Sequence, residues 1–214
     1  MATAAPSLPN YEQRMSANLD WAMDEGGRFF EERSAVQMAL RRITARLTEL
    51  GIPYVVVGGM ALFAHGFRRF TEDVDILVTA GGLERAHTAL EGKGYRPPFE
   101  GSRHLRDTEQ GIRIEFLVTG QFPGDGKPKP VAFPDPDAVA LERAGIRFLN
   151  LPALVELKLA SGMTGSGRLK DLADVQELIR ALALPREFVE KLHEYVQAKF
   201  SELWEDVHAD DVAE

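Results

Sequence analysis

Residues 54–78 read YVVVGGMALFAHGFRRFTEDVDILV, and this stretch decides the fold. Its opening YVVV is a continuous apolar run rich in β-branched residues, which predicts a short buried strand. The glycine pair stops that strand, and MALFAH then predicts a short helix that the next glycine ends. After a polar loop, DVDILV predicts a second strand. The stretch therefore predicts two buried strands joined through a glycine turn and a short helix.

The sequence on both sides of this stretch predicts helices around a small mixed sheet. The expected helices lie at 33–50, 82–92, 152–161, 168–183 and 185–204, the further strands at 103–108, 112–118 and 146–149, and an irregular loop at 120–137. A helix followed by a mixed sheet and then by a helical C-terminal part indicates an α+β fold.

Four parts of the chain differ in character. We expect an N-terminal extension at 1–32, whose first ten residues are frayed, a core at 33–150, a helical region at 151–200 and an acidic tail at 201–214. The core holds the strand pair described above, so we look for function there.

Composition limits the class of protein. The chain has 214 residues, of which 44% are hydrophobic, and this is enough for the core of one globular domain. It contains no cysteine, which excludes a disulfide framework and any thiolate-bound metal. The longest apolar stretch, 54–64, has 11 residues, whereas a membrane-spanning helix needs about 20. Since the N-terminal sequence also lacks the features of a signal peptide, we expect a cytoplasmic protein with no membrane partner.

The negative charge of the chain lies at its two ends. The formal net charge is −8, residues 1–32 contribute −4 and residues 201–214 contribute −6, so that the rest of the chain carries +2. The central body is therefore mildly basic and compatible with a phosphate-bearing ligand. Because no long basic stripe is present, we expect any contact with nucleic acid to be small and local.

Three carboxylates in the core point to a metal site. Side chains two apart on a strand share a face, so Asp73 and Asp75 present two carboxylates side by side. Glu115 is an acid within an otherwise apolar strand, where an unpaired charge is costly. Together the three could hold Mg²⁺, which prefers oxygen ligands. The alternative is structural: Asp73 caps a turn, and Asp75 and Glu115 face solvent.

The glycine pair adds a site for an anion. Gly58 and Gly59 let the backbone approach a ligand closely, and the free amides at the start of the next helix bind phosphate. A triphosphate would then lie between these amides and the metal ligands. By itself such a pair is more often just a tight turn.

Two segments resemble a known superfamily. GGMALFAHGFRRFTEDVDILV (58–78) fits the pattern GG-x-A-x3-HG-x2-R-x-T-x-D-x-D, which resembles the signature of the nucleotidyltransferase superfamily that includes DNA polymerase β. It is most similar to the AbiEii-like and minimal nucleotidyltransferases of bacteria, often components of toxin–antitoxin or phage-defence systems. LKLASGMTGSGRLKDLADVQELI (157–179) is similar to the C-terminal helices of the AbiEii-like group. The resemblance covers residues 33–179 and implies a nucleotidyltransferase core.

The resemblance also implies roles for individual residues. Gly58 and Gly59 correspond to the phosphate-binding turn, Asp73 and Asp75 to the Mg²⁺ ligands, and Glu115 to the third catalytic carboxylate and base. Two Mg²⁺ ions are implied, and Mn²⁺ is an alternative. Two positions depart from the usual pattern, because many members have Gly-Ser at the turn and an aspartate as the third acid.

Four more residues are candidates for nucleotide binding. Arg69 and Thr71 belong to the pattern, while Lys158 and Lys170 lie in the C-terminal segment. Arg69 and the two lysines also have a structural explanation. An arginine can neutralise the acids, a lysine near an apolar stripe can extend to solvent, and Lys170 can pair with Asp174 on a helix surface. Asp171 and Asp174 are further candidates for orienting Lys158 or Arg69.

The sequence therefore favours a Mg²⁺-dependent nucleotidyltransferase that moves a nucleoside monophosphate from an NTP to an acceptor hydroxyl. The acceptor could be an RNA such as a tRNA 3′ end, a partner protein, or a small antibiotic, and a cognate toxin or antitoxin is a possible partner. Two rivals remain: a catalytically silent nucleotide-binding or antitoxin-type module of the same fold, and a protein-interaction domain with a solvated acidic patch.

Overall fold

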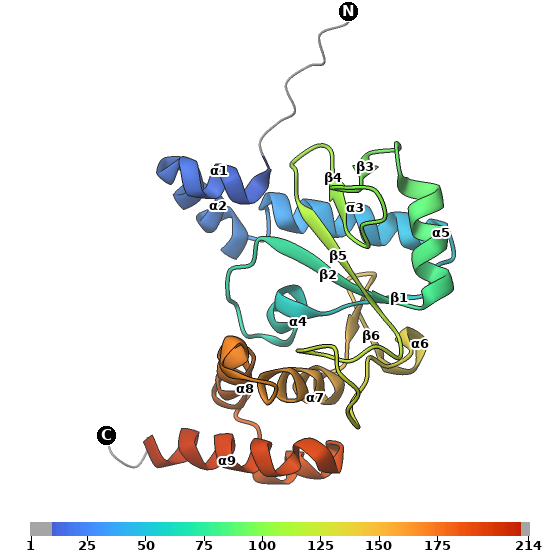
Figure 1. Cartoon of the computed structure of the whole chain (residues 1–214). Coiled ribbons are helices and arrows are strands. Elements are labelled where there is room, and N and C mark those ends of the chain that lie inside the picture. The colour runs from blue at the N-terminus through green and yellow to red at the C-terminus, as the bar shows by residue number, and fades with distance from the viewer. Residues whose placement is uncertain (1–9, 211–214) are drawn as a thin grey trace, which may run out of the picture.

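The structure is a computed structural model that describes residues 10–210. Within that range the strands form one mixed sheet of seven strands in the order β3-β4-β5-β2-β1-β7-β6 (Figure 1). The strands are β1 (Tyr54–Val56), β2 (Asp73–Val78), β3 (Tyr95–Arg96), β4 (Leu105–Asp107), β5 (Arg113–Val118), β6 (Ala140–Arg143) and β7 (Ile146–Leu149). The α+β fold that the sequence predicts is confirmed.

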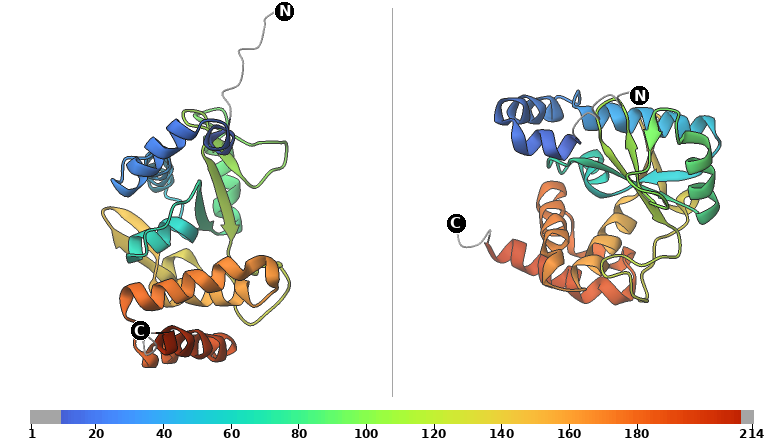
Figure 2. Two further views of the ribbon diagram at one scale, coloured as in Figure 1. Left: turned by 90° about the vertical axis from the view of Figure 1, so that its left-hand side faces the viewer. Right: turned by 45° about the horizontal axis from the view of Figure 1, so that its top comes forward.

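Helices surround this sheet. They are α1 (Tyr11–Ala17), α2 (Leu19–Phe30), α3 (Ala35–Glu49), α4 (Gly58–His65), α5 (Ala80–Leu90), α6 (Pro136–Val139), α7 (Leu151–Gly162), α8 (Leu169–Leu182) and α9 (Glu194–Asp210), with the 3-10 turns η1 (Ser166–Arg168) and η2 (Arg186–Lys191). Figure 2 shows that α1 and α2 lie at one end of the molecule and α7, α8 and α9 at the other. None of the helices between residues 10 and 210 is long and apolar enough to cross a membrane.

The stretch at 54–78 folds as its sequence predicts. β1 is fully buried, α4 follows it directly, and α4 ends at Gly66, which has a φ of 108°. β2 then returns antiparallel to β1, with Val56 opposite Ile76. The chain thereby places the start of α4 and the start of β2 next to each other.

The parallel pairing of β2 with β5 brings distant segments together. Asp73 lies beside Arg113, and Asp75 lies beside Glu115. Both strands alternate between buried apolar and partly exposed side chains, so these polar residues share one face. The opposite face carries the apolar residues Val74, Ile76, Ile114 and Phe116, all of which are buried. One face of the two strands therefore belongs to the hydrophobic core, and the other face carries the candidate site residues.

The ends of the chain differ in detail from the sequence prediction. Residues 11–30, within the expected N-terminal extension, form α1 and α2, and Tyr11 and Phe29 are fully buried in the core. The helix expected at 185–204 is split into η2 and α9, and α9 continues into the expected acidic tail. The predicted fraying of residues 1–10 lies, except for Asn10, outside the described residues, as does the end of the tail at 211–214.

Candidate metal and nucleotide site

Three carboxylates converge at the start of β2 and β5. One oxygen atom from each of Asp73, Asp75 and Glu115 lies within 4.8 Å of the others. All three side chains are partly exposed at a cavity of about 860 Å³. The sequence argument that placed Glu115 beside Asp73 and Asp75 is confirmed. Three carboxylate oxygens at this spacing match the ligand preference of a hard divalent cation such as Mg²⁺. The residues present therefore fit the metal that the sequence predicts.

The charge of this cluster changes the acidity of its most enclosed member. Burial, together with the nearby charges of Asp73 and Glu115, raises the pKa of Asp75 to about 7. Two carboxylates that flank a third resist its ionisation, because like charges repel each other more strongly away from bulk water. A cation that binds here would relieve that repulsion, so the cluster favours positive ligands.

Two side chains hold Asp73 in place. The hydroxyl of Thr71 donates to Asp73 Oδ1 at 2.8 Å, and Arg113 Nη2 donates to Asp73 Oδ2 at 2.6 Å. Arg113 Nη2 also lies 3.6 Å from Glu115 Oε2. Thr71 therefore acts on a proposed metal ligand in this structure and does not line the cavity, whereas Arg113 does.

The glycine turn lies directly against the carboxylates. Gly58 has a φ of 60°, and a Cβ added there would lie 1.8 Å from Asp75 Oδ2. A Cβ on Gly59 would lie 2.8 Å from the Thr71 side chain. No side chain among the described residues caps the start of α4, so its first amides are available to an anion. Both positions therefore require glycine for close packing, and Gly58 also requires it for its backbone conformation.

Gly58→Ala is therefore expected to disturb the metal site. The new methyl group must displace Asp75, and the residue must keep a left-handed φ, so we expect a loss of stability of about 1 to 3 kcal/mol and weaker binding of divalent cations. Thermal unfolding and calorimetric titration with Mn²⁺ measure both. Gly81→Ala is the matched control, because a Cβ at that helical position meets nothing within 4 Å among the described residues. A Gly58→Ala protein that binds Mn²⁺ like the wild type would contradict the assigned packing.

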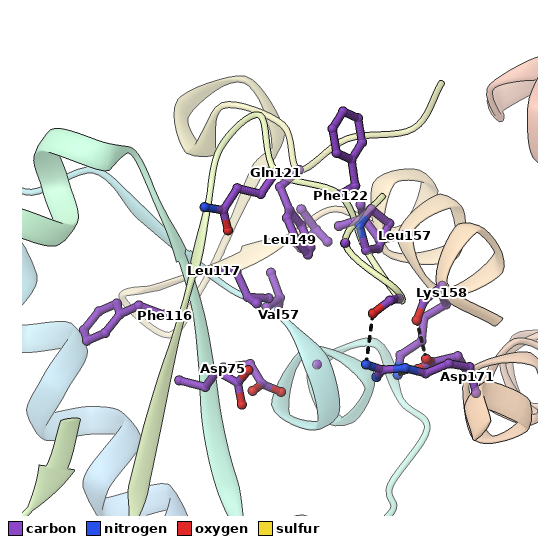
Figure 3. Close-up of a pocket in the computed structure, with 18 of the residues that line it drawn as sticks. Val57, Asp75, Phe116, Leu117, Gln121, Phe122, Leu149, Leu157, Lys158 and Asp171 are labelled. Atoms are coloured by element: carbon purple, nitrogen blue, oxygen red, sulfur yellow. Dashed lines mark hydrogen bonds and ion pairs between the residues drawn. The ribbon is translucent and has the colours of Figure 1, made fainter. Parts of the chain in front are cut away.

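A network of ion pairs lies across the cavity on α7 and α8 (Figure 3). Lys158 Nζ donates to Asp171 Oδ1 and to Asp174 Oδ2, each at 2.7 Å. Arg69 donates to both oxygens of Asp174, at 2.7 and 3.1 Å. Burial raises the pKa of Asp171, but the charge and hydrogen bond of Lys158 and the hydroxyl of Ser161 outweigh this and lower it. Asp171 and Asp174 orient Lys158 and Arg69, as the sequence suggested.

The candidates for nucleotide binding thus take different positions. Gly58 and Lys158 line the cavity, whereas Gly59, Arg69 and Lys170 do not. Lys170 is exposed on α8. Burial and the neighbouring acids Glu12 and Asp73 raise the pKa of Glu72, and the charge of Lys170 offsets only part of that rise. A direct role of Arg69 or Lys170 in nucleotide binding stays a prediction.

The far wall of the cavity was not identified from the sequence. It is formed by the 120–134 loop, which includes Phe122 and Phe133, and by apolar side chains of the sheet, of the residue before α4 and of α7, namely Leu117, Leu149, Val57, Leu154 and Leu157. Arg168 donates to the carbonyl of Gly124 at 3.1 Å, which ties this loop to the start of α8. Figure 3 shows Asp75 on the sheet side of the cavity and Lys158 with Asp171 on the helical side. The cavity therefore carries charged side chains on both its sheet side and its helical side, in addition to its apolar lining.

Comparison with solved structures supports the class of this fold. Among solved structures, the crystal structure of ANT(2″)-Ia in complex with adenylyl-2″-tobramycin is similar to the chain with a TM-score of 0.50 and 15% identity, over 77% of this chain and 96% of that one. A nucleotidyltransferase structure from H. pylori has a TM-score of 0.44 and 14% identity, over 80% of this chain and 92% of that one. The first of these supports the same fold.

Sequence comparison identifies the family. The search of curated proteins gave no match. A family model described as "Uncharacterised nucleotidyltransferase" matches residues 4–202. Because this match spans most of the chain, the protein belongs to that nucleotidyltransferase family.

Proposed function

We propose that this protein uses Mg²⁺ to transfer a nucleoside monophosphate from an NTP to an acceptor hydroxyl. The observation that carries the proposal is the convergence of Asp73, Asp75 and Glu115 within 4.8 Å, next to a glycine turn that opens a helix. Carboxylates beside an anion-binding helix start are what a metal–triphosphate complex requires. Membership of a nucleotidyltransferase family supports the same chemistry.

Each residue has a role that follows from its position. Asp73 and Asp75 hold the metal, which supplies charge neutralisation for the triphosphate and the departing pyrophosphate. The amides at the start of α4 bind phosphate oxygens, and Lys158 faces the cavity with a positive charge. Glu115 completes the metal site, and its carboxylate accepts the proton of the attacking hydroxyl. Positioning and electrostatic stabilisation provide most of the rate enhancement.

The acceptor is a hydroxyl on RNA, on a partner protein or on a small molecule. The similar protein ANT(2″)-Ia was solved with an adenylylated small molecule, adenylyl-2″-tobramycin. The resemblance of residues 58–78 to AbiEii-like and minimal nucleotidyltransferases instead supports an RNA 3′ end or a partner protein, in a toxin–antitoxin or phage-defence system. We propose the second group of acceptors, and the assay below includes all three classes.

Label transfer from NTPs tests this function. Purified protein is incubated with each α-labelled NTP, Mg²⁺, and tRNA, a protein extract or an aminoglycoside. We expect labelled acceptor and released pyrophosphate with Mg²⁺, no product in excess EDTA, and recovery when Mg²⁺ or Mn²⁺ is restored, because the carboxylates cannot hold a triphosphate without a cation. Nucleotide binding that depends on Mg²⁺ but gives no turnover would indicate a silent module of the same fold. Absence of both binding and transfer would contradict the proposal.

A further inference from the structure

Arg113 lies among the carboxylates that we assign to the metal. It occupies the first position of β5, beside Asp73 in the parallel ladder. Its Nη2 atom lies 2.6 Å from Asp73 Oδ2 and 3.6 Å from Glu115 Oε2. One guanidinium nitrogen thus pairs with two of the three carboxylates.

No other cation of the structure takes this place as closely. Lys158 lines the same cavity, but its ammonium group donates to Asp171 and Asp174 at 2.7 Å. Arg69 is bonded to both oxygens of Asp174. Among the described residues, Arg113 is therefore the guanidinium or ammonium group that pairs with these carboxylates, and it offsets their mutual repulsion.

The contact of Arg113 is also suited to exchange. Its side chain is 42% exposed, so it can leave the carboxylates without crossing the core. Its Nε atom is buried and has no hydrogen-bond partner among the described residues, so the guanidinium is not fully satisfied in this position. A planar guanidinium pairs with phosphate oxygens at least as well as with a carboxylate. A triphosphate in the cavity would offer that alternative partner.

We propose that Arg113 is an exchangeable counter-ion: it holds Asp73 and Glu115 before the metal binds, yields these carboxylates to the metal, and then contacts a phosphate of the bound nucleotide. The nucleotide half of this inference rests on the proposed function. A divalent cation among these carboxylates and the guanidinium of Arg113 would repel each other, because both would lie within a few ångströms of Asp73 and Glu115. Binding of the bare metal is thereby penalised, and binding of metal with nucleotide is favoured.

Metal titration tests the first half. Mn²⁺ is titrated calorimetrically into nucleotide-free wild type, Arg113→Gln, Arg113→Lys and the control Arg96→Gln, which alters an exposed arginine of β3. We expect Arg113→Gln to bind Mn²⁺ at least about tenfold more tightly, since a competing charge has been removed. Arg113→Lys, which keeps the charge, and Arg96→Gln should stay near the wild type. Unchanged or weaker Mn²⁺ binding in Arg113→Gln would overturn the inference, because it would mean that Arg113 only organises the carboxylates.

Nucleotide titration tests the second half. The α,β-methylene analogues of the four NTPs are titrated in the presence of Mg²⁺, and Arg113→Gln should bind the preferred analogue at least about tenfold more weakly. The inference predicts that Arg113→Gln binds Mn²⁺ alone more tightly and the nucleotide analogue more weakly than the wild type, whereas a purely structural defect would weaken both. Equal nucleotide affinity in Arg113→Gln and wild type would overturn the inference that Arg113 contacts a phosphate of the bound nucleotide. If the wild type binds none of the analogues, both the proposed function and the proposed contact of Arg113 with phosphate are contradicted. The Mn²⁺ titration still tests the role of Arg113 as a counter-ion of the carboxylates.

Discussion

Asp75→Asn is expected to lower nucleotide transfer about a thousandfold, the upper end of the loss caused by removing one electrostatic contact in an active site. Asp75 packs against Gly58 and lies beside Glu115 in the β2–β5 register, so its carboxylate adjoins both the proposed phosphate site and the proposed base. Asparagine has the same shape but carries no charge. The loss should therefore appear in kcat and in metal affinity without a change of fold.

The same substitution should stabilise the metal-free protein at high pH. The pKa of Asp75 is raised to about 7 in the folded chain, whereas the pKa of an aspartate in an unfolded chain is about 3.8. The folded state therefore holds the proton more tightly, and this contribution to stability is present at low pH and is lost as pH rises from about 4 to 7. Asparagine cannot ionise, so it avoids that loss.

Two measurements check these expectations. Label transfer with Mg²⁺ gives the activity, and thermal unfolding in EDTA at pH 5 and pH 8 gives the stability. We expect the melting temperature of Asp75→Asn, relative to that of the wild type, to be higher at pH 8 than at pH 5. Asp206→Asn, at an exposed position of α9, is the matched control and should change neither. Retained transfer activity in Asp75→Asn would exclude Asp75 as a metal ligand.

Local sequence signals were sufficient for the centre of the fold. A β-branched run predicts β1, two glycines predict the turn into α4, and an alternating pattern predicts β2. Each of these signals lies within a few consecutive residues. The cluster of three carboxylates could be predicted with one further argument, that a buried acid needs a partner. That argument placed Glu115 near Asp73 and Asp75, and the register of β2 with β5 agrees with it.

Elements that depend on distant contacts could not be found in this way. β6 has three exposed residues in four and no apolar alternation, and it is a strand because it pairs with β7. The helix expected at 185–204 breaks at Leu192, where the backbone is extended, and the amide of His193 donates to Glu156 Oε1 on α7 at 2.6 Å. Tertiary hydrogen bonding overrides helix propensity at that point.

Arg113 shows what a closer analysis of the sequence could have revealed. It precedes Glu115 by two residues on a strand, and the two-residue period places both side chains on the same face. An arginine next to a proposed metal-binding acid is a signal for a counter-ion. The pairing of Arg113 with Asp73, by contrast, needed the parallel register of two strands that the sequence alone does not define.

Asp174→Ala is expected to destabilise the protein by about 3 to 5 kcal/mol, the cost of breaking a buried ion pair on one side. Asp174 is 3% exposed, and it accepts hydrogen bonds from Arg69 and Lys158. Lys158 would keep Asp171 as a partner, but Arg69, which is only 20% exposed, would lose both of its bonds to Asp174. An uncompensated charge in a nearly dry position is the main source of the expected loss.

This defect should also reach the carboxylates of the site. Arg69 lies two residues before Thr71, whose hydroxyl donates to Asp73, so the loop that leads into β2 is anchored to α8 through Asp174. Releasing that anchor would let Thr71 and Asp73 shift relative to Asp75. We therefore expect Asp174→Ala to bind Mn²⁺ more weakly even below its unfolding temperature, although Asp174 is not a metal ligand.

Thermal unfolding and Mn²⁺ titration measure the two effects of Asp174→Ala together. For a chain of this length, the expected loss corresponds to a fall in melting temperature on the order of 10 °C. Glu177→Ala is the control on the same helix, because its ion pair with Arg180 is exposed on both sides, and pairs of that kind contribute about 0 to 1 kcal/mol. A melting temperature of Asp174→Ala no lower than that of Glu177→Ala would mean that Arg69 finds another partner. If Mn²⁺ affinity is unchanged while the melting temperature falls, the network supports the fold but does not position Asp73.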